Sequence, residues 1–180
     1  MKELDKDGRI LCELQGKIFE RSAKEYTTSS AVFVRRYMNS DYAARMDREG
    51  FADRPTDVQD AFDSLDEQYG ASQYGSLVYT QDELFWIGYI YRCWAYAYEL
   101  SSKAVYKICN VKDMHAVYYA YHTMDPLNAV QRLMEAKGID LDAFDALKLA
   151  EEAGSSKAVN IVLMGRLSNY FDATVEEWMK

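Results

Sequence analysis

The sequence predicts an all-α fold, a helical bundle around one aromatic-rich helix over about residues 81–100, with a short helical appendage at the C-terminal end. Three observations support this prediction. Apolar residues recur at three- and four-residue steps, which is the spacing of one helix face. No stretch before Gly138 alternates polar and apolar residues as a half-buried strand does. Only two prolines occur in 180 residues, which permits long helices.

The first two helices are predicted from apolar spacing. Residues 4–26 are expected to form an amphipathic helix whose apolar face holds Ile10, Leu11, Leu14, Ile18 and Phe19. Residues 27–30, which carry only hydroxyl side chains, break the chain and supply helix caps. A second helical run covers residues 31–46, and Asn39-Ser40-Asp41 is expected to interrupt it.

Two capping signals place the next helices. Thr56-Asp57-Val58-Gln59 has the capping-box spacing, in which a hydroxyl and a side-chain amide satisfy free backbone donors. That helix is expected to end at Gly70, because glycine is favoured just past a helix C-terminus. Residues 71–79 are predicted to be a loop. Thr80-Gln81-Asp82-Glu83 repeats the capping-box spacing and opens the central helix.

The central helix divides into two arcs when it is projected at about 100° per residue. The narrow arc holds Phe85, Tyr89, Arg92 and Tyr96. Tyr89 and Tyr96 lie three and four residues from Arg92, so its guanidinium is expected to stack on one of these rings. The wide arc is assigned to the core and holds Leu84, Trp86, Ile87, Ile90, Tyr91, Cys93, Trp94, Ala97 and Tyr98.

The narrow arc is the first candidate partner-binding site. Aromatic side chains beside an arginine are typical of binding hot spots, so the arc is predicted to contact a protein partner. Arg35-Arg36, next to Tyr37, form a second candidate patch. Two alternatives stay open. In one, another helix of the same bundle covers the narrow arc; in the other, Arg35-Arg36 is a solvated basic turn.

The rest of the chain continues as helices and then changes in composition. Helices are predicted over 103–109 and 111–122, and Asp125-Pro126 opens another that closes at Lys137-Gly138. Beyond that point aromatic residues become sparse and alanine, leucine and valine predominate. The sequence therefore predicts a domain over 1–138 and an appendage over 139–180.

Composition and charge disfavour several classes of function. The net charge of −8 and the pI of about 4.8 make nucleic acid an unlikely general ligand, since phosphates are repelled. Cys12, Cys93 and Cys109 contain no Cys-x-x-Cys pair, which argues against a disulfide framework and favours a reducing cytoplasm. The N-terminal residues lack the apolar run of a signal peptide, and residues 84–98 are too short to span a bilayer. A cytoplasmic protein without a membrane segment is expected.

The sequence contains none of the common motifs for catalysis or cofactor binding. No Walker motif, dinucleotide glycine motif or Gly-x-Ser-x-Gly elbow occurs, so no enzymatic activity, cofactor or metal is predicted. His115 and His122 lie roughly 10 Å apart along a helix, too far to bind one metal from a straight helix. Both are predicted to be polar tips on a packed aromatic face. An enzyme that uses one of them is the alternative.

Three stretches of the first 138 residues resemble a family of small, all-helical bacterial proteins of the antitoxin type, encoded in toxin–antitoxin-like gene clusters. The stretches are SAVFVRRYMNSD at 30–41, ELFWIGYIYR at 83–92 and YHTMDP at 121–126. The resemblance implies a non-enzymatic protein that binds and regulates a toxin partner encoded nearby. It carries over no active residue.

Residues 139–180 resemble a different protein, the C-terminal end of the beta subunit of indolepyruvate ferredoxin oxidoreductase. The matching stretches are DALKLAEEAG at 145–154 and KAVNIVLMG at 157–165. The glycine-rich loop and parallel sheet that precede this tail in that family have no match here, so the tail by itself implies no catalysis. The alternative function is a fragment or fusion of a 2-oxoacid ferredoxin oxidoreductase subunit.

Overall fold

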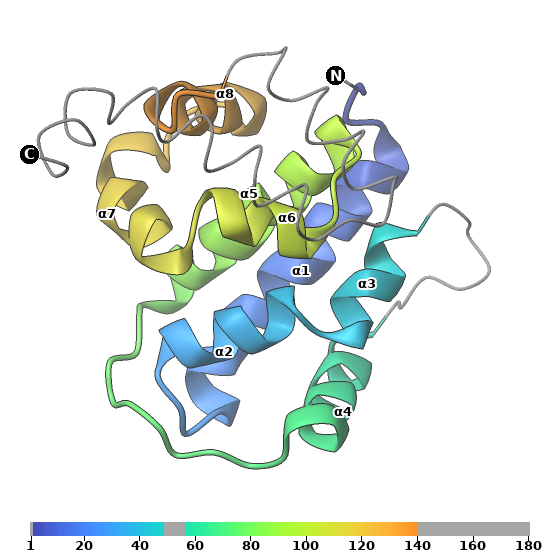
Figure 1. Cartoon of the computed structure of the whole chain (residues 1–180), viewed down its shortest axis with the longest axis vertical. Helices are drawn as coiled ribbons and strands as arrows, with labels where there is room; N and C mark the ends of the chain where they lie inside the picture. The colour runs from blue at the N-terminus through green and yellow to red at the C-terminus, as the bar shows by residue number, and fades with distance from the viewer. Residues whose placement is uncertain (1, 49–56, 140–180) are drawn as a thin grey trace, which may run out of the picture. The chain divides into compact units, whose positions relative to one another are not determined.

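The computed structural model describes residues 2–48 and 57–139, which form eight α-helices and no strand (Figure 1). This confirms the predicted all-α fold. The helices are α1 (Lys6–Glu25), α2 (Ser30–Met38), α3 (Asp41–Asp47), α4 (Val58–Tyr69), α5 (Gln81–Tyr98), α6 (Ser102–Ile108), α7 (Val111–Tyr121) and α8 (Pro126–Ala136).

The chain divides by its contacts into two units, residues 1–130 and 131–180. The boundary between the two units lies inside α8, a few residues before the predicted domain boundary at 138–140. The predicted domain boundary stays a prediction. Of the second unit, only residues 131–139 are described. The appendage predicted after residue 139, and its resemblance to an oxidoreductase subunit, lie outside the described residues.

Side-chain caps fix most helix starts, as the sequence predicted. Thr80 accepts a hydrogen bond from the amide of Glu83, and Asp125 accepts one from the amide of Leu127 at 3.0 Å. The predicted cap of α4 was one residue too early. Asp57 caps this helix and accepts from the amide of Gln59, and Thr56 lies outside the described residues. Because the Asp57 carboxylate accepts a hydrogen bond from the backbone amide two residues later, the helix begins at Val58.

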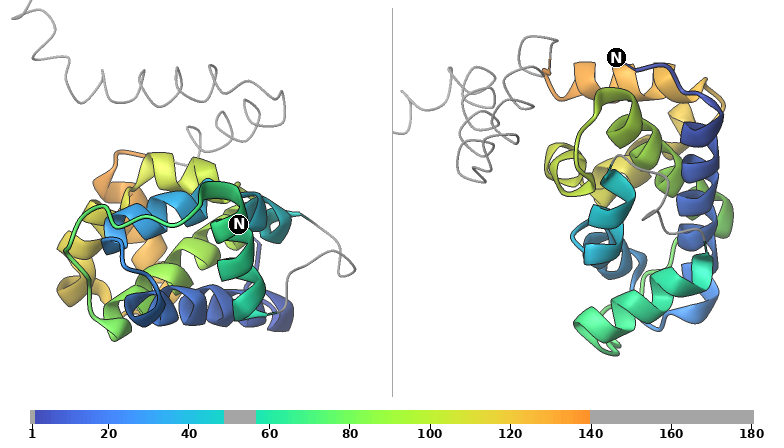
Figure 2. Two further views of the ribbon diagram at one scale, coloured as in Figure 1. Left: turned by 90° about the horizontal axis from the view of Figure 1, so that it is seen from below. Right: turned by 90° about the vertical axis from the view of Figure 1, so that its right-hand side faces the viewer.

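Helix α5 packs along α1 over most of its length, and the two helices run antiparallel. Residue pairs far apart in sequence show the direction: the amide of Lys2 donates to the carbonyl of Ala97 at 2.6 Å, whereas Gly16 faces Phe85. In both views of Figure 2, α1 lies along one edge of residues 1–130. A Cβ atom on Gly88 would lie 2.6 Å from the Gln15 carbonyl oxygen, so glycine permits this close approach.

The core of residues 1–130 is rich in aromatic contacts between helices. The Phe19 ring of α1 packs edge-on against Phe33 and Tyr37 of α2, with ring centroids 5.6 and 4.9 Å apart. Every residue that the sequence assigned to the wide arc of α5 is buried, which confirms that assignment. Among the described residues, no helix combines the length and apolarity needed to cross a bilayer.

Candidate partner-binding site

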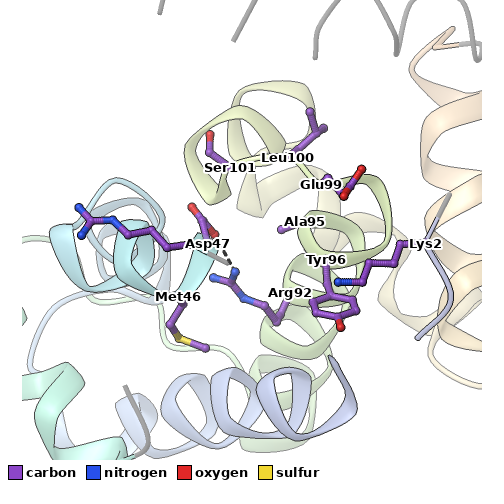
Figure 3. A pocket seen from close by; sticks show the side chains of 10 residues that line it. Lys2, Met46, Asp47, Arg92, Ala95, Tyr96, Glu99, Leu100 and Ser101 are labelled. Carbon is purple, nitrogen blue, oxygen red and sulfur yellow. Dashed lines mark hydrogen bonds and ion pairs between the residues drawn. The ribbon is translucent and has the colours of Figure 1, made fainter. Parts of the chain in front are cut away.

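Arg92 lies in the middle of α5 with only 2% of its surface exposed. Its guanidinium donates three hydrogen bonds to side chains of three other helices. Nε donates to Gln15 Oε1 of α1 at 2.9 Å, Nη1 to Asp47 Oδ1 of α3 at 2.6 Å, and Nη2 to Ser102 Oγ of α6 at 2.8 Å. Figure 3 shows the guanidinium directed at Asp47. Arg92 therefore joins four helices.

Asp47 completes this network from the end of α3. Its Oδ2 accepts from the backbone amide of Ser102 at 2.8 Å, and its Oδ1 accepts from the Ser102 hydroxyl at 2.7 Å. Ser102 is the first residue of α6, so a carboxylate here also meets the positive end of that helix. A buried charge is tolerated only when it is paired and hydrogen-bonded, and Arg92 and Asp47 satisfy each other in this way.

Arg92 was predicted to belong to a partner-binding surface, but the structure buries it. The helical projection placed it on the narrow arc, but α1, α3 and α6 enclose this part of the arc. The expected stacking on Tyr89 or Tyr96 is replaced by the bonds to Gln15, Asp47 and Ser102, and Lys2 Nζ lies 4.3 Å from the Tyr96 ring centroid. Burial by itself lowers the pKa of Arg92, but the nearby Asp47 carboxylate leaves the pKa raised, so the guanidinium keeps its positive charge.

A pocket of about 230 Å³ opens beside the Arg92–Asp47 pair (Figure 3). Cations and carboxylates both line it, so their charges largely cancel. The pocket therefore has no strong preference for an anion or a cation. Its lining includes Lys2, Asp47, Arg48, Arg92, Tyr96 and Glu99.

The remaining residues of the narrow arc, Phe85, Tyr89 and Tyr96, are half-buried beside α1. A Cβ atom on Gly8 of α1 would lie 2.6 Å from the Tyr96 ring, and the Tyr96 hydroxyl donates to Asp5 at 2.8 Å. Burial raises the pKa of Tyr89 to about 12. Helix α1 thus covers part of this arc, in agreement with the alternative that another helix of the bundle covers it. Partner binding by the three aromatic residues stays a prediction.

The second candidate patch lies against a different helix. Arg36 donates to the carbonyl of Gly70 at 3.0 Å and lies 5.4 Å from the Tyr69 ring centroid, so it ties α2 to the end of α4. Arg35 is exposed. The arginine patch therefore contacts α4, while the aromatic arc contacts α1. Binding by Arg35 and Arg36 also stays a prediction.

Both histidines are packed against aromatic rings. His115 stacks on Tyr79 with ring centroids 4.2 Å apart and an interplanar angle of 2°, and its Nδ1 pairs with the buried Glu83 carboxylate. His122 lies 4.9 Å from the Tyr118 ring, and its Nδ1 is 3.1 Å from the Tyr118 carbonyl oxygen. These contacts agree with the polar-tip prediction.

The feature that most resembles a binding surface was not predicted from the sequence. In the connection between α4 and α5, Tyr74, Leu77 and Val78 are 77%, 65% and 46% exposed. We call residues 72–79 the anchored segment, because hydrogen bonds to residues 27–30 hold its backbone in place. Figure 1 shows this connection passing the start of α2.

The anchoring bonds follow one another along the chain. The Thr27 hydroxyl donates to the carbonyl of Ser72 at 3.0 Å, the amide of Ser29 to the carbonyl of Tyr74 at 3.1 Å, and the amide of Ser30 to the carbonyl of Leu77 at 3.0 Å. The Ser30 hydroxyl accepts from the amide of Tyr79 at 2.9 Å. The hydroxyl run at 27–30 was predicted only to break the chain and cap a helix. It also orders the anchored segment.

Gly75 is required at its position in the anchored segment. Its φ of +79° lies in the left-handed region, and a Cβ atom there would lie 2.6 Å from Ser29 Oγ. The three exposed apolar side chains are therefore carried by a backbone of defined conformation.

Comparisons of the chain with family models, with curated proteins and with solved structures gave no match.

Proposed function

We propose that this protein is a non-enzymatic, antitoxin-like interaction protein that binds and regulates a protein partner encoded by a neighbouring gene. The observation that carries the proposal is the anchored segment, which presents Tyr74, Leu77 and Val78 to solvent. The resemblance of residues 1–138 to the antitoxin type supports the same class of function.

The physical argument is that these side chains are exposed although their backbone is ordered. Large apolar side chains that are exposed together on one short segment are candidates for an interaction site. A segment whose backbone is already fixed loses little conformational entropy when it binds, so more of the contact free energy contributes to affinity. Hydrogen bonds from residues 27–30 provide this ordering before any partner arrives.

The narrow arc of α5 contributes less to the proposed binding surface than the anchored segment does. Phe85, Tyr89 and Tyr96 are half-buried against α1, and each can contribute only the part of its ring that α1 leaves uncovered. Arg92 is excluded from the surface by its burial. We propose that Arg92 contributes indirectly, because its network holds α1, α3, α5 and α6 together.

The proposal is tested by co-expressing the chain with the product of the neighbouring gene and co-purifying the two. The wild-type chain should retain the neighbouring protein. The double variant Tyr74→Ser and Leu77→Ser should fold normally, because both side chains are exposed, and should lose most of the retained protein. Tyr119→Ser is the matched control, since Tyr119 of α7 is 83% exposed and lies outside the anchored segment.

Two results would contradict the proposal. In one, the wild-type chain retains none of the neighbouring protein. In the other, the variant of the anchored segment and the Tyr119→Ser control retain it equally well.

A further inference from the structure

The stretch of chain that holds α4 and the anchored segment contains acidic residues but no basic ones. No lysine or arginine occurs between Arg54 and Arg92. Glu83 in this interval is buried against His115, and the other carboxylates are exposed. The exposed ones are Asp57, Asp60, Asp63, Asp66, Glu67 and Asp82.

The acidic helix α4 and the anchored segment both accept hydrogen bonds from residues 26–30. The Tyr26 hydroxyl donates to Asp66 of α4 at 2.9 Å, and the Thr27 hydroxyl donates to the carbonyl of Ser72. The amides of Ser29 and Ser30 donate to the carbonyls of Tyr74 and Leu77, farther along the anchored segment. Residues 26–30 therefore support the C-terminal half of α4 and the anchored segment side by side.

Two arginines also contact α4, on the side that packs against α1 and α2. Arg21 donates to Gln59 and lies 5.4 Å from the Phe62 ring centroid, while Arg36 donates to Gly70. Phe62 belongs to the buried face of α4. Asp60, Asp63 and Glu67 recur at three- and four-residue steps on the exposed face, so the arginines leave that face acidic.

We infer that the partner is a protein that surrounds an apolar recess with lysine or arginine side chains. The recess would receive Tyr74, Leu77 and Val78, and the basic side chains would face the carboxylates of α4. This inference rests on the proposed function and adds the chemistry of the partner. Opposite charges at the rim of an interface accelerate association and exclude wrong partners.

Other occupants fit this surface less well. A second copy of this chain, docked through the same surface, would place acidic helices against each other. Nucleic acid and anionic membranes would meet the same repulsion. A basic protein surface is the occupant that the charge of α4 favours.

The experiment measures the association rate and Kd of the purified neighbouring gene product with full-length chains, at low and high salt. The test variant is Asp63→Lys with Glu67→Lys, two exposed positions on α4. The matched control is Glu3→Lys with Asp7→Lys, which changes the net charge equally at the exposed start of α1. Circular dichroism and thermal melting verify that each variant is folded.

We expect the α4 variant to associate at least about tenfold more slowly than the control at low salt, with the difference shrinking at high salt. Equal slowing in both variants, or no slowing, would overturn the inference about a basic partner while leaving the proposed function intact. If the wild-type chain does not bind the neighbouring protein at all, the proposed function itself fails. Self-association of the wild-type chain through this surface, detected by sedimentation and lost in Leu77→Ser, would also overturn the inference.

Discussion

Asp47 Oδ1 lies 2.6 Å from Arg92 Nη1, and this ion pair joins the end of α3 to the middle of α5. Arg92 is almost completely buried, whereas Asp47 keeps 14% of its side chain exposed. Losing its partner should therefore be more costly for Arg92 than for Asp47. Asp47 retains the hydroxyl and amide of Ser102, but Arg92 would keep its charge in a buried site.

Removing the carboxylate should destabilise the fold strongly. Asp47→Ala leaves a buried guanidinium without its counter-ion, and we expect a loss of about 3–5 kcal/mol in the free energy of unfolding. Arg92→Met should cost less, because Asp47 is partly exposed and keeps its bonds to Ser102. Urea denaturation of each variant measures both losses.

A surface ion pair provides the control for this prediction. Lys17 and Glu13 are exposed and 3.7 Å apart, so Lys17→Ala should change the free energy of unfolding by less than about 1 kcal/mol. If Asp47→Ala is no more destabilising than Lys17→Ala, the buried network does not hold the helices together.

The close approach of α1 and α5 depends on Gly88. A Cβ atom there would lie 2.6 Å from a backbone oxygen of α1, and backbone cannot move aside as a side chain can. Gly88→Ala should therefore lower the free energy of unfolding by about 1–3 kcal/mol. Gly16→Ala is the comparison, since its nearest neighbour is the Phe85 ring at 2.9 Å, which can shift, and the nearest backbone oxygen is farther away, at 3.1 Å. Thermal melting should rank Gly88→Ala as the less stable variant.

Buried and half-buried tyrosines should make the fold sensitive to high pH. Burial raises the pKa of Tyr89 to about 12 and raises the pKa of Tyr37 and Tyr91 well above the ordinary value. An unfolded tyrosine has a pKa of about 10, so the folded state holds these protons more tightly. The stability from this difference is fully present below about pH 10 and is lost as the pH rises through the folded pKa values.

Absorbance at 295 nm during an alkaline titration measures this effect. The buried phenols should ionise later than those of the chain in urea, and their ionisation should coincide with unfolding followed by circular dichroism. A single titration near pH 10 with the fold intact would show that these hydroxyls are accessible to solvent.

The conformation of the anchored segment should depend on Gly75. Gly75→Ala combines a left-handed backbone with a clash at Ser29 Oγ, so the segment should detach from residues 29–30. Gly70→Ala is a matched control, because Gly70 also has a positive φ but has nothing within 4 Å of its Cβ position. Amide hydrogen exchange at Ser29 and Ser30 should accelerate in Gly75→Ala and remain near wild type in Gly70→Ala. Equal protection in both variants would contradict the anchoring.

The first 139 residues should fold and bind without the rest of the chain. The antiparallel packing of α1 and α5 and the Arg92 network both lie within residues 1–130. A chain that ends at residue 139 is expected to melt cooperatively and to retain the neighbouring gene product. Loss of cooperative melting would show that residues 140–180 belong to the core, and it would favour the oxidoreductase-subunit alternative.

Local features of the fold were predictable from the sequence, and long-range contacts were not. Helix starts at Thr80 and Asp125, and the buried arc of α5, depend on residues a few positions apart. The burial of Arg92 depends on Ser102, Asp47 and Gln15, which lie 10, 45 and 77 residues away. A projection of one helix contains no information about those partners.

The anchored segment was missed for the same reason. Gly75 and the small polar residues around it predicted a loop, and residues 71–79 are a loop. The hydroxyls that order this loop lie 45 and 49 residues earlier, at Thr27 and Ser30. A sequence shows the apolar run at Leu77 and Val78, but only the fold shows that these side chains face solvent while the backbone is held.

The most direct test of partner binding by the anchored segment is amide hydrogen exchange of the full chain, free and mixed with the neighbouring gene product. We predict that the partner slows exchange at residues 72–79 and leaves the exposed end of α7 around Tyr119 unchanged. Slower exchange elsewhere, with residues 72–79 unaffected, would contradict partner binding by the anchored segment.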